Sequence, residues 1–72
     1  MEYLVVYEKS ADGSIWATVP DLDGCYSVGD SVDDAREHVK EAIELYLEQL
    51  KAEGKPTPAP SHLKAEMVVV AA

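Results

Sequence analysis

The chain has 72 residues, a length that allows one domain with one small core. Its 14 acidic and 6 basic residues give a formal net charge of −8, which repels phosphate backbones and anionic membranes, so no direct nucleic-acid or membrane contact is expected. A single cysteine excludes an internal disulfide, and the sequence has neither a zinc-ligand spacing nor a basic leader, which predicts a cytoplasmic protein without cofactor or metal.

The first predicted elements are two strands of a hairpin. Residues Glu2–Lys9, "EYLVVYEK", are rich in β-branched and aromatic side chains on both faces, which predicts a strand buried on both sides. The pair Asp12-Gly13 then predicts a tight hairpin turn of the primed type. An antiparallel second strand is expected over Ser14–Val19, where apolar residues alternate.

The stretch "VPDLDGCYSVGDS", residues 19–31, contains the only cysteine and could be a reactive site or a reversal of the chain. A nucleophilic cysteine needs a nearby base, and neither His38 nor His62 comes with a recognisable partner pattern, so a buried structural Cys25 is favoured. The stretch predicts a reversal of the chain, then a short third strand over Cys25–Val28, and then the residues that cap the following helix. Its structural motif comprises Pro20, Asp21, Gly24, Cys25, Gly29, Asp30 and Ser31.

A long amphipathic helix is predicted to follow. Ser31 and Asp34 have the spacing of a capping box, and Gly54 with Pro56 ends the helix. One arc of about 140° is apolar, while six acids share an opposite arc of about 100°. These acids form the candidate partner-binding face: Asp33, Asp34, Glu37, Glu41, Glu44 and Glu48. The face suits a basic partner, although solubility alone would also explain it.

The C-terminal part combines a proline-rich strap with a last strand. "GKPTPAPSH", residues 54–62, favours an extended path, and "LKAEMVVVAA", residues 63–72, reads as a strand that returns parallel to the first. The predicted fold is α+β, with order β-β-β-α-β and a four-stranded mixed sheet that carries one helix on one face. The last strand is an exposed apolar edge, which favours a homo-oligomer, a dimer or tetramer, through Met67, Val68, Val69 and Val70.

An enzymatic alternative rests on three acids. Glu8, Glu44 (or Glu48) and Glu66 in this element order are similar to the carboxylates of two-metal nucleases. Such a site needs carboxylates that converge on ions about 4 Å apart, whereas the helix acids point away from the sheet. The chain is therefore expected not to be an enzyme.

Several short motifs follow one another along residues 12–50 and just beyond. They are Trp16, Pro20-Asp21-Leu22, Gly24-Cys25, Gly29-Asp30-Ser31, the helix residues Ala35, Ala42 and Leu47, and then Gly54 with Pro56-x-Pro58. In this order they resemble the HicB-like antitoxin family, and the resemblance covers nearly the whole chain.

The resemblance implies a degraded ribonuclease H-like fold without the catalytic acids of that enzyme. It also implies a role: to bind and neutralise a small basic ribonuclease toxin of the HicA type by masking its RNA-binding surface. Residues 1–72 are expected to be a single HicB-like domain without the C-terminal DNA-binding domain of many members, which leaves any role in transcription open. The alternative is an orphan HicB-like oligomeric interaction module that has no toxin partner.

Overall fold

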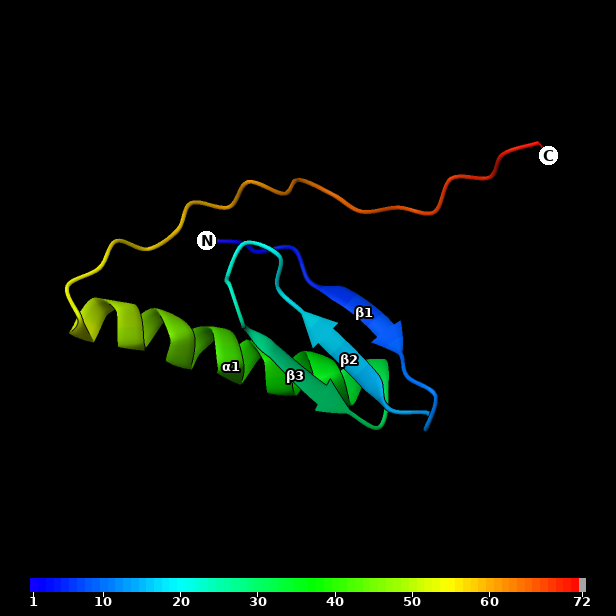
Figure 1. The fold of residues 1–72 in the computed structure, drawn as a ribbon, viewed down its shortest axis with the longest axis horizontal. Helices are drawn as coiled ribbons and strands as arrows, with labels where there is room; N and C mark the ends of the chain where they lie inside the picture. The colour runs from blue at the N-terminus through cyan, green and yellow to red at the C-terminus, as the bar shows by residue number, and fades with distance from the viewer. Residues whose placement is uncertain (72) are drawn as a thin grey trace.

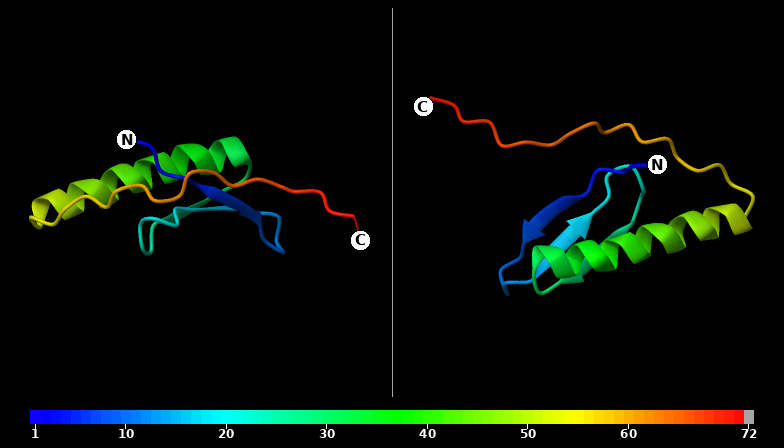
Figure 2. Two further views of the ribbon diagram at one scale, coloured as in Figure 1. Left: turned by 90° about the horizontal axis from the view of Figure 1, so that it is seen from above. Right: turned by 180° about the vertical axis from the view of Figure 1, so that it is seen from behind.

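The computed structural model describes residues 1–71, which form a three-stranded sheet and one helix. In chain order the elements are β1 (Val6–Lys9), β2 (Ile15–Thr18), β3 (Tyr26–Gly29) and α1 (Val32–Ala52). The sheet is antiparallel with strand order β1-β2-β3, and α1 lies across one of its faces (Figures 1 and 2). The predicted α+β class with one helix on one face of the sheet is confirmed.

The hairpin between β1 and β2 differs in turn type from the prediction. Ser10 N donates to Ser14 O at 2.9 Å, so the ladder continues to this pair, and the loop has three residues that end in Gly13 at φ 90°. A type I turn followed by one left-handed residue fits such a loop, whereas the predicted primed turn is wrong. Asp12 instead accepts hydrogen bonds from Ser10 and Ser14, which lower its pKa to about 2.

The first strand is shorter than predicted because its partner ends. Val6 pairs with Thr18, the last residue of β2, and Pro20 has no N–H to continue the ladder, so residues 2–5 have no partner strand. The predicted burial of both faces of this strand is also wrong. The helix covers only one face of the sheet, and Glu8 and Lys9 are exposed.

The core lies between α1 and the sheet and extends into the loop that follows β2. Its fully buried side chains are Ala17, Val19, Leu22, Cys25, Ala35 and Val39. Partly buried side chains from the segment before and within β1 and from the second half of α1 pack around them. The core is small, as the chain length predicts.

Both ends of α1 have the predicted caps. The Ser31 Oγ accepts a hydrogen bond from Asp34 N at 3.0 Å, and the Asp34 carboxylate accepts from Asp30 N at 2.9 Å, so this is a variant of the capping box in which the acid reaches the residue before the N-cap. At the other end, Gly54 has φ 70° and Lys55 N donates to Leu50 O at 2.9 Å. This is the Schellman arrangement that favours glycine after a helix.

The predicted fourth strand does not form in the described chain. Residues 55–71 contain neither strand nor helix, and residues 63–71 are exposed. The strap is held at residues 58–62 beside the segment that precedes β1, and the chain then runs past the sheet instead of pairing with it (Figures 1 and 2). A strand needs a partner backbone, so strand propensity alone gives no fourth strand. Ala72, the last residue of this prediction, lies outside the described residues.

Candidate interaction surface

Most of the predicted acidic face is on the solvent side of α1. Asp33, Glu37, Glu41, Glu44 and Glu48 are exposed, whereas Asp34 is half-buried. The two aspartates of this group have local partners. Asp33 pairs with Arg36 at 2.6 Å, and Asp34 belongs to the capping box and lies 3.6 Å from the Nε2 atom of His38.

The four remaining acids form what we call the glutamate stripe: Glu37, Glu41, Glu44 and Glu48. At 100° per residue they fall within about 60° of one another around the helix axis. Among residues 1–71 none of them forms an ion pair. Lys40 and Lys51 lie along one side of the stripe without forming an ion pair with it, and like charges three and four residues apart destabilise a helix, so this surface keeps an excess of negative charge.

Leu45 lies beside the glutamate stripe and was not assigned to any surface from the sequence. Its side chain is 65% exposed, although it sits in the middle of the helix. The sequence contains the signal, because Leu45 falls outside the apolar arc on the helical wheel. An exposed leucine beside these acids adds an apolar contact to a charged surface.

The face of the sheet opposite α1 carries a second exposed group. The rings of Trp16 and Tyr26 stack with centroids 5.3 Å apart and an interplanar angle of 15°. Their side chains are 41% and 53% exposed. Cross-strand aromatic pairs stabilise a sheet, and here the pair also leaves a large apolar surface open to solvent.

The loop that contains Cys25 is built as two successive turns. Leu22 N donates to Val19 O and Cys25 N donates to Leu22 O, and this places the Leu22 and Cys25 side chains in the core. Burial raises the pKa of the Cys25 thiol, which favours the unreactive protonated form. The structure therefore places this cysteine in a packing role.

The three acids of the nuclease alternative are not brought together. Glu8 is on β1, Glu44 is on the outer side of α1, and Glu66 pairs with Lys64 at 3.2 Å in the C-terminal segment. Within the described chain, no three side chains of His, Cys, Asp or Glu are grouped closely enough to bind a metal ion.

His38 has a local structural role. Its Nδ1 atom is 2.8 Å from Val28 O. This hydrogen bond, followed by the charge of Asp34, raises the pKa of His38.

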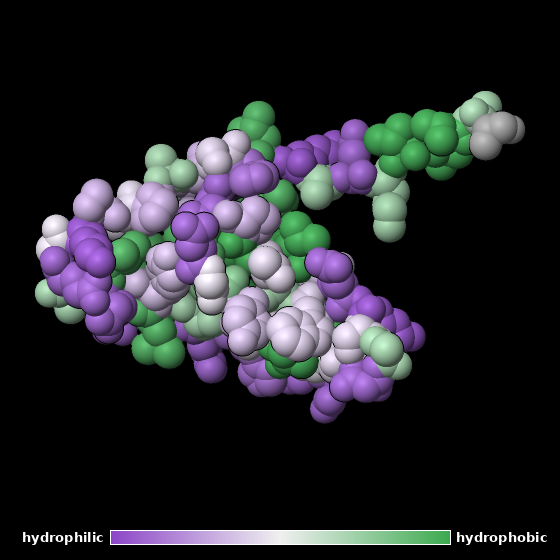
Figure 3. Space-filling view, in the orientation of Figure 1, coloured by the Kyte–Doolittle hydropathy of each residue, from purple (hydrophilic) through white to green (hydrophobic). Residues whose placement is uncertain are grey.

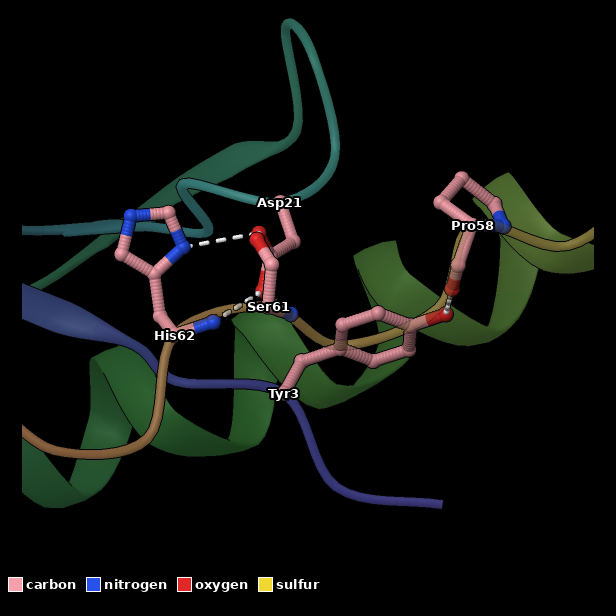
Figure 4. Close-up of polar contacts among 5 residues, drawn as sticks. All are labelled: Tyr3, Asp21, Pro58, Ser61 and His62. Atoms are coloured by element: carbon pink, nitrogen blue, oxygen red, sulfur yellow. Dashed lines mark hydrogen bonds and ion pairs between the residues drawn. The ribbon is translucent and has the colours of Figure 1, made fainter.

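Asp21 anchors the strap, a role that the sequence did not indicate. Its carboxylate accepts hydrogen bonds from Ser61 N at 2.9 Å, from the Ser61 hydroxyl and from His62 N at 3.1 Å, and it lies 2.7 Å from His62 Nδ1 (Figure 4). The Tyr3 hydroxyl donates to Pro58 O nearby. These bonds, first of all the one from the Ser61 hydroxyl, hold the pKa of Asp21 well below its usual range.

Replacing Asp21 with Asn is expected to release the strap. An amide oxygen accepts these hydrogen bonds less strongly than a carboxylate, so backbone amide exchange at Ser61 and His62 should become about 10-fold faster. Because the folded pKa is depressed, the anchor of the native chain is fully present above about pH 4, the unfolded value, and is lost as the pH falls through the lower folded value. Exchange in α1 provides the control and should not change; equal exchange at Ser61 in both proteins would contradict the anchor.

Among residues 1–71, α1 is the only helix, and it is too polar to cross a membrane.

The family model described as the HicB-like antitoxin of bacterial toxin–antitoxin systems matches residues 3–69. A UPF0150 protein of Synechocystis is 48% identical over 56 residues, which cover 78% of this chain and 71% of the relative. A UPF0150 protein of Archaeoglobus fulgidus is 49% identical over 51 residues, 71% of this chain and 74% of the relative. One of Helicobacter pylori is 50% identical over 48 residues, 67% and 65% of the two chains.

Proposed function

The chain belongs to the HicB-like antitoxin family of bacterial toxin–antitoxin systems, and on that premise we propose that it binds and neutralises a small basic ribonuclease toxin of the HicA type. It does so in the cytoplasm by masking the surface on which the toxin holds RNA, and it performs no catalysis of its own. A ribonuclease needs a positive surface for the phosphate backbone of its substrate. An acidic protein that occupies this surface competes directly with RNA.

The observation that carries the proposal is the glutamate stripe. Four carboxylates line the solvent side of α1 without an ion-pair partner in the described chain, and the whole chain has a net charge of −8. Their mutual repulsion would be relieved by cationic side chains of a partner. The stripe therefore supports binding to a basic protein better than solubility alone, which would be served equally well by scattered charges.

Leu45 supplies an apolar point at the edge of the same surface. Charges on an interface increase the association rate and select the partner, whereas much of the affinity comes from buried apolar side chains. With a 65% exposed side chain, Leu45 has area to bury against the toxin.

The test is co-purification of this protein with the product of a small basic reading frame next to its gene. Each protein would be purified separately, and affinity would be measured by calorimetry at about 0.05 M and about 1 M NaCl, where the screening length falls severalfold. We expect a stoichiometric complex that weakens by at least 10-fold at the higher salt concentration, and loss of RNA cleavage by the toxin in the same mixture.

The other outcomes separate the alternatives. A complex whose affinity does not depend on salt would keep the antitoxin function and exclude the glutamate stripe as its basis. A protein that binds no such partner and leaves RNA cleavage unchanged would be an interaction module without a toxin.

A further inference from the structure

The C-terminal segment, residues 63–71, is the part of the structure with the most exposed apolar surface. Leu63, Met67 and Val69 are at least 97% exposed, and Val68 and Val70 are 71% and 75% exposed. In the described chain this segment makes no backbone hydrogen bond with the sheet. Figure 3 shows its apolar end projecting from the body of the molecule. An extended, valine-rich segment of this kind is expected to pair with another strand.

Of the two edges of the sheet, the β1 edge suits this segment better. β1 and β3 are the two edge strands. On β3, the Val28 carbonyl already accepts a hydrogen bond when His38 Nδ1 donates, at 2.8 Å. On β1, the described hydrogen bonds of Val6–Lys9 are those to β2, and the extended residues 2–5 lengthen this edge. An incoming strand therefore finds free backbone groups along β1.

The strap brings the C-terminal segment to the β1 side of its own chain, but residues 63–71 do not pair with β1 there. The anchor at Asp21 holds Ser61 and His62 beside residues 2–4, and Leu4 and Leu63 line the same hollow. Alternate prolines in the strap favour an extended path, and the segment does run past the sheet in all three ribbon views (Figures 1 and 2).

We propose that residues 63–71 of one chain pair with the β1 edge of a second copy, and that the second copy returns the same contact. Each chain has one unpaired apolar segment and one open β1 edge, so two exchanges satisfy both chains and close the assembly as a dimer with twofold symmetry. The exchange covers the apolar side chains and pairs the backbone of both segments. This dimer does not depend on the proposed toxin and uses a surface other than the glutamate stripe.

The first experiment measures mass by light scattering for the chain of residues 1–72 and for three variants of the same length. The native chain should be a dimer. The double variant Val68→Asp with Val70→Asp places charge in the pairing segment, and Val69→Pro removes a backbone donor. Both should halve the mass and leave helix content unchanged, since these side chains pack against nothing in the single chain. Leu45→Asp makes the same chemical change at an exposed leucine of α1 and should remain a dimer.

A second measurement identifies the edge. Amide exchange at Val6–Lys9 should become at least 10-fold faster in the Val68→Asp/Val70→Asp variant than in the native dimer, while exchange at Tyr26–Gly29 should not change. A native chain that is monomeric at every concentration, a Val69→Pro variant that remains dimeric, or dissociation by Leu45→Asp would each overturn the proposal. Faster exchange at β3 in place of β1 would overturn it as well.

Discussion

Replacing Gly29 with Ala is expected to lower the free energy of unfolding by about 3 kcal/mol, at the upper end of the range for overpacking a core. A methyl group at this position would lie 2.4 Å from Ala35 N, 2.8 Å from Ala35 Cα and 2.9 Å from the Asp34 carbonyl carbon. All three atoms are backbone atoms of the first turn of α1, so no side chain can rotate away. Only glycine lets the start of the helix approach the end of β3 this closely.

The size of this loss in unfolding free energy follows from how firmly the end of β3 and the first turn of α1 are held. Ala35 is fully buried, and the capping box fixes the first turn relative to Asp30 and Ser31. A domain of this length has a stability of about 4–11 kcal/mol, so the substitution would remove a large part of it. Urea denaturation at one fixed protein concentration measures the loss, because association would otherwise contribute to the apparent stability.

Gly24→Ala is the matched control. A methyl group at Gly24 meets no atom within 4 Å, but the residue has φ +74°. Only the left-handed backbone opposes the substitution, so the loss should be about 1 kcal/mol. Equal losses of unfolding free energy in both variants would show that the close approach of β3 to the helix backbone does not make Gly29→Ala more costly.

The elements that the sequence predicts well depend on neighbouring residues. The helix begins after Ser31 because its hydroxyl accepts from the free N–H of Asp34, and the Asp34 carboxylate in turn accepts from Asp30 N before the helix. It ends before Gly54 because this residue adopts φ 70°. Each of these signals acts within one turn of the chain, where composition and spacing are sufficient to predict structure.

The parts that were missed depend on residues far apart in sequence. Asp21 and Ser61 are separated by 40 positions, and nothing near Asp21 indicates that its carboxylate anchors the strap. Strand propensity in Met67–Val70 was recognised, but propensity does not say which edge, or which chain, supplies the partner. The candidate acids were found by periodicity, whereas the engagement of Asp33 by Arg36 depends on side-chain geometry.

Reversing Glu37, Glu41 and Glu44 to lysine is expected to weaken binding of a basic toxin by about 100-fold at low salt, since each like-charge contact raises the dissociation rate and slows association. The three side chains are exposed, and lysine favours a helix nearly as well as glutamate. The variant should therefore fold and dimerise like the native chain. Calorimetry with the basic partner at about 0.05 M NaCl gives the affinity, and circular dichroism gives the helix content.

The control must separate the position of the charges from their number. Each reversal changes the charge by two, so the net charge rises from −8 to −2 in the helix variant and equally in a variant with Asp23, Asp30 and Glu53 changed to lysine. These three acids are exposed and lie outside α1. If the glutamate stripe contacts the toxin, the control should lose much less affinity than the helix variant, because long-range attraction alone is largely screened beyond about 10 Å at 0.1 M salt. Equal losses would mean that overall charge attracts the partner and that another surface, such as the open face with Trp16 and Tyr26, makes the contact.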